Sequence, residues 1–368
     1  MSAIALSTAS DDALAAMLAA RGAPAFRLAQ LRRATWQPFV GGLGEIRQLP
    51  AGLTAALGQE LLFSTVEVAA ESEADQGLTV KLLCRLADGQ TIETVAMETP
   101  ARGEARRRST VCVSTQVGCA VGCPFCATGR MGLRRSCTPA EVVDQVRAAA
   151  SALHRRRLGP VTHVVYMGMG EPLAAYATTV ASLRVLTGPA GISARRITVS
   201  TSGVVPAIHR LADEGIGCTL AISLHAATDE LRDRLVPLNR VHPLASLVDA
   251  GTRYAARTGR RLSLEWCLIG GVNDSPEQAR ALAELARRAR AHINVIPMNH
   301  IEDSPWGPPD RRTEVAFLGG LDGVTVTVRD TRGADTDAAC GQLRAALEQR
   351  RMLRPDGTLS PPRAVAAV

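Results

Sequence analysis

The feature that most constrains this chain is a group of three cysteines, Cys119, Cys123 and Cys126, separated by three and then two residues. A short loop containing Gly122 can curl and bring such thiols around one centre, as soft metals and iron–sulfur clusters require. A closed zinc site or a fully ligated ferredoxin-type cluster uses four protein ligands, and this loop supplies three. The spacing favours a cluster with one open coordination position. A zinc knuckle with a distant fourth ligand and three purely structural cysteines stay open as alternatives.

The composition is that of a globular protein large enough for one big domain or two ordinary ones. Of 368 residues, 46% are apolar and 21% are charged. The sequence contains no run of eighteen apolar residues, so no membrane span is expected. Residues 1–10 lack the basic and apolar segments of a signal peptide, so we expect a cytoplasmic protein. In that reducing compartment, nine cysteines are expected to serve metals or chemistry.

The positive charge is carried almost entirely by arginine. The net charge is +7, and Lys81 is the only lysine among 42 cationic residues. Chemistry that needs a lysine, such as a G-K-[ST] phosphate loop or a Schiff base, is therefore nearly excluded. Planar guanidinium groups bind phosphates and stack on bases, which favours a nucleic-acid partner. A compositional bias with a solvated surface explains the charge equally well. The arginine clusters are 106–108, 134–135, 155–157 and 195–196.

Hydrophobic periodicity predicts an α/β fold. Thr138 and Ser275 each begin a capping box with proline at the first helical position. Alternating strands and helices predict a parallel sheet with covering helices, either open or closed into a barrel. Upstream, Asp88-Gly89 predicts a hairpin turn between two strands. Strands are expected at 78–86, 91–97, 110–114, 163–167, 196–200, 219–223, 262–268, 292–297 and 324–328, and early helices at 11–22, after residue 26 and at 51–60.

These patterns divide the chain into four parts. Residues 1–62 are expected to form a helical accessory module that binds nucleic acid, and 63–104 a β-hairpin linker region. Residues 105–350 are expected to form the main α/β core, and 351–368 a loose, proline-rich tail. A nucleic-acid path is expected over the helical module and the arginines near 106 and 134.

Polar residues recur where the predicted strands end. The three cysteines follow one strand, Gly170-Glu171 follow the next, and Ser200 lies at the end of another. Active sites of α/β folds lie at this edge, because the carboxyl ends of parallel strands meet there. A lone glycine-rich turn or a lone histidine is more often a packing feature, but several polar groups at one edge favour a ligand site. The others are the stretch Ser223-Leu224-His225, then Asn299 and, beyond the last strand, Cys340.

Taken together, these stretches resemble the radical S-adenosylmethionine (SAM) RNA adenine methyltransferases of the RlmN/Cfr type, over residues 105–345 and more weakly before them. The resemblance implies a partial (β/α)6 TIM-type barrel with an N-terminal helical module and a small β-hairpin extension. It also implies a [4Fe-4S] cluster and SAM as cofactors. The stretches that carry it are Cys112-Val-Ser-Thr-Gln-Val-Gly-Cys119, Met167-Gly-Met-Gly-Glu-Pro172, Thr198-Val-Ser-Thr-Ser-Gly203, Ser223-Leu-His225, Gly271-Val-Asn-Asp274 and Asp337-Ala-Ala-Cys-Gly-Gln-Leu343.

The resemblance further implies roles for individual residues. Cys340 matches the cysteine that is itself methylated, Cys112 the resolving cysteine, and Glu93 the proton acceptor. The implied cluster ligands are Cys119, Cys123 and Cys126. The implied SAM contacts are Gly170, Glu171, Ser200, Ser223, Leu224, His225 and Asn299.

The implied chemistry explains why two cysteines are needed besides the cluster ligands. C2 and C8 of adenine are electron-poor carbons without a usable lone pair, so direct transfer of a SAM methyl group is unfavourable there. The Cys340 thiolate can take the methyl group by displacement, and a second SAM then activates it for addition to the base. Removal of the ring proton and attack of Cys112 on the Cys340 sulfur would release the product and leave a disulfide bond.

The other cysteines and the tryptophans have simpler interpretations. Trp266 is expected in the core, and Trp306 is the better candidate for stacking on an RNA base. The loop 298–312 around Trp306 keeps Asn299 but departs from the family's usual aromatic and proline-rich continuation, which leaves substrate choice open there. Small core or boundary positions are expected for Cys84, Cys137, Cys218 and Cys267.

The leading hypothesis is methylation of adenosine C2 in 23S rRNA, with tRNA as a second substrate. Residues 126–129 and 131–133 are similar to the Cfr branch, which methylates C8 and confers antibiotic resistance, whereas 116–119 and 167–172 favour C2. An RNA-binding iron–sulfur protein without methyl transfer and a zinc structural module are further alternatives. The expected partners are RNA and an electron donor such as flavodoxin or ferredoxin, and the expected state is a monomer without membrane contact. The regiochemistry, the preferred RNA, the reductant and the oligomeric state stay open.

Overall fold

A ten-stranded mixed sheet forms the centre of the computed structural model, which describes residues 3–101, 106–301, 304–329 and 342–343. The strand order is β14-β13-β12-β11-β10-β9-β6-β5-β4-β3. From β6 to β14 the neighbouring strands run parallel, which confirms the predicted α/β class. The sheet is open within the described residues, with β14 and β3 at its edges. The parallel strands are β6 (Arg108–Cys112), β9 (His163–Tyr166), β10 (Ile197–Thr201), β11 (Thr219–Ser223), β12 (Ser263–Leu268), β13 (His292–Pro297) and β14 (Val326–Val328).

Three antiparallel strands extend this sheet beyond β6. They are β3 (Val66–Ala74), β4 (Thr79–Leu86) and β5 (Thr91–Thr99). The hairpin predicted at Asp88-Gly89 is confirmed between β4 and β5. The β-hairpin extension expected from the resemblance continues the main sheet, because β5 pairs with β6 and places Val95 opposite Cys112. Strand β3 was missed in the sequence because its outer edge is polar, and such charged edges are typical of strands that end a sheet.

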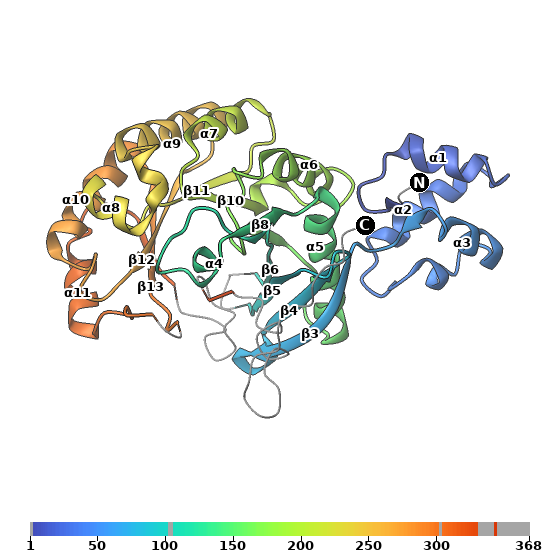
Figure 1. Cartoon of the computed structure of the whole chain (residues 1–368), viewed down its shortest axis with the longest axis horizontal. Coiled ribbons are helices and arrows are strands. Elements are labelled where there is room, and N and C mark those ends of the chain that lie inside the picture. The colour runs from blue at the N-terminus through green and yellow to red at the C-terminus, as the bar shows by residue number, and fades with distance from the viewer. Residues whose placement is uncertain (1–2, 102–105, 302–303, 330–341, 344–368) are drawn as a thin grey trace, which may run out of the picture.

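Helices on the outside of the sheet complete the core (Figure 1). The capping box predicted at Thr138 is confirmed at the start of α5. The second box is only half formed: Ser275 accepts from the Gln278 N–H, whereas the Gln278 side chain accepts from the Ala227 N–H. The helices after β6 are α4 (Ala127–Arg130), α5 (Pro139–Arg155), α6 (Tyr176–Thr187), α7 (Val205–Asp213), α8 (Asp229–Leu235), α9 (Leu244–Thr258), α10 (Pro276–Ala289) and α11 (Arg311–Gly319).

The N-terminal helices form a small cluster beside α5 (Figure 1). They are α1 (Asp11–Ala19), α2 (Phe26–Thr35) and α3 (Ala51–Leu57), joined by the short parallel pair β1 (Ile4–Ala5) and β2 (Leu61–Leu62). Their shared apolar core contains Leu6, Leu14 and Leu31. Polar contacts connect this cluster to α5, since Arg147 Nε donates to the Thr35 carbonyl at 2.8 Å.

The main core lies between the sheet and its outer helices. Trp266 is fully buried, and Cys84, Cys137 and Cys218 are buried in the same cluster, as predicted. Cys267 is the exception, because it is half-buried and faces a cavity described below. The cysteine loop lies between two short strands that pair antiparallel, β7 (Gln116–Gly118) and β8 (Leu133–Ser136). No helix in the described part of the chain is long and apolar enough to cross a membrane.

Gln145 joins α5 to the sheet through one buried amide. Its Oε1 accepts from the Ser114 N–H at 2.8 Å and from the Thr94 hydroxyl at 2.7 Å. Its Nε2 donates to the carbonyls of Ser114, at 2.9 Å, and Glu141, at 3.1 Å. Ser114 follows β6, so this amide fixes the strand end that leads into the cysteine loop.

We predict that Gln145→Leu lowers the free energy of unfolding by about 2–4 kcal/mol, because it leaves buried donors and acceptors without partners. Urea denaturation followed by circular dichroism measures this. Gln59→Leu, at an exposed turn, is the matched control and should change stability by less than about 0.5 kcal/mol. Equal stability of the Gln145 variant and the parent would contradict the role given to this amide.

Candidate active site

A cavity of about 180 Å³ opens at the carboxyl ends of β9 to β13. This is the edge at which the sequence predicted a site. All three loop cysteines line it, so the structure brings them to one place as expected. The other predicted site residues that line it are Gly170, Glu171, Ser200, Ser223, His225 and Asn299.

Three predicted site residues do not line the cavity, and a fourth is not described. Leu224 is fully buried in the main core. Cys112 and Glu93 are buried on β6 and β5. Cys340 lies outside the described residues.

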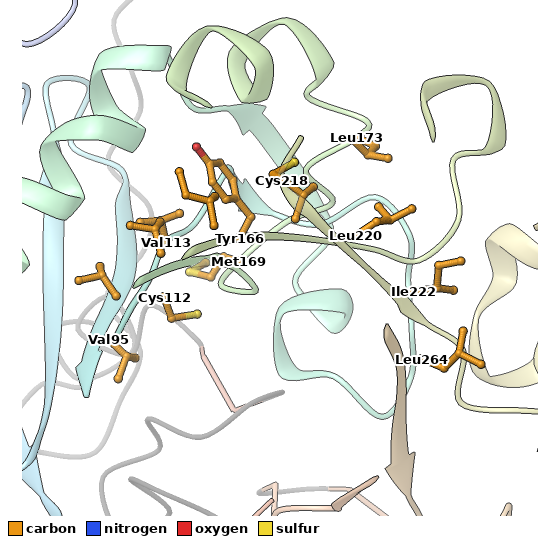
Figure 2. Close-up of a cluster of buried hydrophobic side chains, with 14 of the residues drawn as sticks. Val95, Cys112, Val113, Tyr166, Met169, Leu173, Cys218, Leu220, Ile222 and Leu264 are labelled. Atoms are coloured by element: carbon orange, nitrogen blue, oxygen red, sulfur yellow. The ribbon is translucent and has the colours of Figure 1, made fainter. Parts of the chain in front are cut away.

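Cys112 and Glu93 nevertheless share one face of the sheet. Val95 is directly opposite Cys112, and Glu93 is two residues from Val95 on the same strand. Directly paired residues and residues two apart point to the same side of a sheet. Figure 2 shows Cys112 and Val95 together below the strand, with Val113 on the other side. Thr94 points to that other side, where it bonds to Gln145 of α5. Cys112 and Glu93 therefore face away from α5, toward the inside of the curved sheet.

The cysteine loop is held by tight backbone packing. The Cys126 N–H donates to the Cys123 carbonyl at 3.1 Å, which closes the turn before α4. A Cβ atom on Gly129 would lie 2.6 Å from that same carbonyl oxygen, so only glycine fits there. The Thr128 hydroxyl donates to the Leu343 carbonyl at 2.7 Å, although 215 residues separate the two in sequence.

The buried thiols of the cysteine loop do not readily ionise unless a cation binds next to them. Burial raises the pKa of Cys119 to about 11 and raises that of Cys123 well above its usual value. Bound metal must therefore displace protons from these thiols. In the described ranges no three His, Cys, Asp or Glu side chains converge closely enough to hold one metal ion. A [4Fe-4S] cluster does not require such convergence, because each thiolate binds a separate iron. Three thiols from one short loop along one cavity fit such a cluster.

Glu171 is a buried carboxylate that is fixed by neighbouring donors. Its Oε2 accepts from both the N–H and the hydroxyl of Ser202 at 2.7 Å, and its Oε1 accepts from the Leu173 N–H at 2.9 Å. Burial raises its pKa above the usual value, and the Ser202 bonds oppose that shift. Gly170, with φ +99°, packs against Gln116, and a Cβ atom on Gly170 would lie only 2.5 Å from the Gln116 Cβ. This carboxylate can accept a hydrogen bond from a cationic ligand in the cavity.

Arg232 is an important residue that the sequence analysis missed. Its side chain is fully buried, and its guanidinium donates to the carbonyls of Leu224 (3.0 Å), Ser223 (3.1 Å) and Ser202 (2.6 Å). Burial lowers its pKa to about 10, and the acidic groups around it partly oppose this. The charge lies behind the cavity wall, where it favours negative charge on Cys123. The surrounding sequence, Asp-Glu-Leu-Arg-Asp, is typical of an exposed helix, so it does not distinguish Arg232 from a surface arginine.

His225 is held in a strained backbone conformation as a neutral ring. Its φ is +61°, and its carbonyl accepts from the Asn273 side chain at 2.7 Å. Burial, with a contribution from Arg232, lowers the pKa of His225 to about 3. Its Nδ1 accepts from the Cys267 N–H at 2.9 Å, so the proton of the neutral ring is on Nε2. The cavity therefore has a neutral N–H donor at this position.

Two further polar residues of the cavity region lie inside strands. Glu265, on β12, lines the cavity and accepts from Ser263 at 2.7 Å and from Asn294 at 2.8 Å. Cys267, expected at a core or boundary position, is half-buried and also lines the cavity. The signal for Glu265 was an isolated acid in an otherwise apolar strand, which needs a partner when it is buried.

The chain is similar to known proteins over most of its length. A family model described as the Radical SAM superfamily matches residues 113–293. A relative from Parafrankia sp. (strain EAN1pec), named "Probable dual-specificity RNA methyltransferase RlmN", is 46% identical, and the match covers 92% of this chain and 91% of the relative. A relative with the same name from Mycolicibacterium paratuberculosis (strain ATCC BAA-968 / K-10) is 45% identical, with 91% and 93% covered. The crystal structure of a radical SAM methyltransferase from Sphaerobacter thermophilus has a TM-score of 0.87 at 44% identity, with 93% of this chain and 99% of that chain covered.

We predict that Gly129→Ala causes the loss of most bound iron after anaerobic purification or reconstitution. The added methyl group must move the backbone of Cys123, at a cost of about 1–3 kcal/mol. Iron analysis and the visible absorbance of the cluster measure this. Gly44→Ala is the control, because nothing lies within 4 Å of a Cβ at Gly44. Full iron content in the Gly129 variant would contradict the packing argument.

We also predict that His225 makes folding less favourable as the pH falls. The unfolded chain protonates this histidine below about pH 6.5, whereas the folded chain does so only below about pH 3, so stability decreases across that window. Between pH 7 and pH 5.5, His225→Asn should lose about 1 kcal/mol less unfolding free energy than the parent. Asparagine tolerates the positive φ, so the backbone is retained. Urea titrations of both proteins at both pH values measure the difference, and identical losses would exclude a neutral buried ring.

Proposed function

Because the chain belongs to the RlmN family of radical SAM RNA methyltransferases, we propose that it methylates C2 of adenosine in RNA. The observation that carries this proposal is the contact between the cysteine loop and the residues that follow Cys340 in sequence. Leu343, three residues after Cys340, is buried and bound to Thr128, two residues after Cys126. Gln342 is also buried, and its side chain donates to the His300 carbonyl, next to Asn299, at 2.7 Å. The described residues nearest in sequence to Cys340 thus border the cysteine loop and the cavity.

The proposed cofactors are a [4Fe-4S] cluster and SAM. Cys119, Cys123 and Cys126 would hold the cluster, and its open iron would bind SAM. When bound, the reduced cluster and SAM supply the radical that activates an inert C–H bond. Glu171 would accept a hydrogen bond from the amino group of SAM, and the Nε2–H of His225 would donate to an acceptor atom of SAM. The remaining proposed SAM contacts are Gly170, Ser200, Ser223, Leu224 and Asn299.

Three residues of this chain would handle the methyl group and the proton. Cys340 carries the methyl group as S-methylcysteine. Glu93 takes the proton from C2: the C–H bond breaks, the proton passes to a carboxylate oxygen, and the bonding electrons stay with the ring. Cys112 resolves the protein–RNA adduct and ends in a disulfide with Cys340. The shared sheet face of Cys112 and Glu93 supports this division of roles.

The proposed substrates are 23S rRNA and tRNA, in keeping with the dual specificity in the relatives' name. Residues 1–62 and 63–104 would act as an RNA-binding module and a connecting region ahead of the radical SAM core at 105–350, and Trp306 would stack on a base. We further propose a cytoplasmic monomer that receives electrons from a flavodoxin or ferredoxin.

The test is methyl transfer by the purified holoenzyme. With a methyl-labelled SAM, a reductant and RNA from cells lacking the gene, we expect labelled 2-methyladenosine by nucleoside mass spectrometry. Labelled 8-methyladenosine would change the assigned carbon, and unlabelled RNA would remove the assignment.

Variants separate the roles of the two cysteines. Cys340→Ala should abolish transfer, because no thiolate accepts the methyl group. Cys112→Ala should leave RNA covalently attached to the protein, because nothing displaces Cys340 from the adduct. Cys84→Ala, at a buried core cysteine without a proposed role, is the control and should retain activity. Product release at the normal rate by the Cys112 variant would contradict the resolving role.

A further inference from the structure

Lys81 differs from every other cationic residue of this chain because it is the only lysine. It lies on β4, and its side chain is 13% exposed. Its Nζ is 3.4 Å from Oε1 of Glu93, whose side chain is 2% exposed. The single lysine is therefore paired with the buried carboxylate for which a proton-accepting role is proposed.

The strand register places this pair beside Cys112. Lys81 is directly opposite Val95 on β5, and Val95 is directly opposite Cys112 on β6. The three residues form a row across β4, β5 and β6 on one face of the sheet. Glu93 lies on the same face, two residues nearer to the rim where the parallel strands end, and its carbonyl accepts from the Ser114 hydroxyl at 2.6 Å. The pair therefore borders the reaction site.

Fold stability alone does not explain such a pair. A buried ion pair contributes little net stability, since removing two charges from water offsets their mutual attraction. Apolar side chains at both positions would pack with Val95 and Cys112 on the same face of the sheet at a lower desolvation cost. A buried carboxylate at the edge where the parallel strands end is better explained by chemistry, and its negative charge then needs a fixed partner.

We infer that Lys81 is a positioning residue for Glu93, whose carboxylate it orients for removal of the adenine proton. The inference rests on the proposed function. An ammonium group is a compact charge that can bind one carboxylate oxygen, whereas a guanidinium fork tends to bind both. Lys81 contacts Oε1 and so fixes the group through one of its two oxygens.

A second ion pair on the same strand provides a matched control. Glu98, near the other end of β5, is also buried, and Arg107 Nε is 3.5 Å from its Oε1. Arg107 is 57% exposed, and Glu98 Oε2 also accepts from Gly159. Arg107→Met thus removes a cation from a buried glutamate at the edge of the sheet away from the cavity.

The experiment compares Lys81→Met, Arg107→Met and Glu93→Gln with the parent holoenzyme. We expect Lys81→Met to release 2-methyladenosine about 10- to 100-fold more slowly, as for a weakened general base. Methylation of Cys340 and the Kd for RNA should stay within about 2-fold, and covalent RNA–protein adduct should accumulate. With RNA deuterated at C2, the ratio of release rates for hydrogen and deuterium should rise above the parent value. The Lys81→Met/Glu93→Gln double variant should be no slower than Glu93→Gln, because both changes affect one step.

The outcomes separate the two levels of the argument. Parent enzyme without methylated Cys340 or 2-methyladenosine would overturn the proposed function. A working parent with a slow Glu93→Gln variant, but a Lys81→Met variant of normal rate and isotope effect, would overturn only the inference. A slow Lys81→Met variant without adduct or an increased isotope effect would also overturn it. If Lys81→Met does not fold, as judged by Cys340 methylation, Lys81→Gln is measured with the same criteria.

Discussion

The ends of the central strands are tied together by hydrogen bonds that begin at the buried guanidinium of Arg232. It donates to carbonyls after β10, at Ser202, and after β11, at Leu224. Ser202 in turn donates two hydrogen bonds to Glu171 after β9, and the Glu171 N–H donates to Gln116 at the start of β7. Each link is buried, so breaking one leaves a polar group without a partner at a cost of about 1–3 kcal/mol. The strand ends are therefore fixed relative to one another before any ligand binds.

This fixed edge explains how one cavity accommodates both thiols and a cationic ligand. Burial raises the pKa values of Cys119 and Cys123, so these thiols become ligands only when bound metal supplies positive charge. Arg232 favours negative charge on Cys123 from behind the wall, while Glu171 offers the opposite charge to a ligand in front. Cluster binding should accordingly release protons and stabilise the loop through α4. That loop is in turn packed against Leu343, which couples the cluster region to the C-terminal segment.

The sequence predicted this site well where residue type and strand position agreed. The cysteine spacing and the polar residues after each strand identified the cavity edge, because parallel strands end together. It could not predict Arg232, since a surface-like helical context gives no sign that three carbonyls meet at its side chain. It also missed β3, whose polar outer positions lack a clear alternating pattern. Most strands could be predicted from local periodicity. The burial of Arg232 and the pairing of β3 depend on contacts that are made only after folding.

The antiparallel strands explain how Glu93 reaches the same edge without following a parallel strand. Parallel strands bring their last residues to the cavity, as β10 does with Thr201 and β11 with Ser223. Strand β5 runs in the opposite direction, so its first residues lie at that edge, and Glu93 is the third residue of β5. Strand β4 runs with β6 and brings Lys81 against Glu93 from the other side. A sheet of parallel strands alone would offer only residues from strand ends and the loops after them. The antiparallel extension adds side chains held rigidly within strands, which suits the role proposed for Glu93 as a base that keeps one orientation through a multistep reaction.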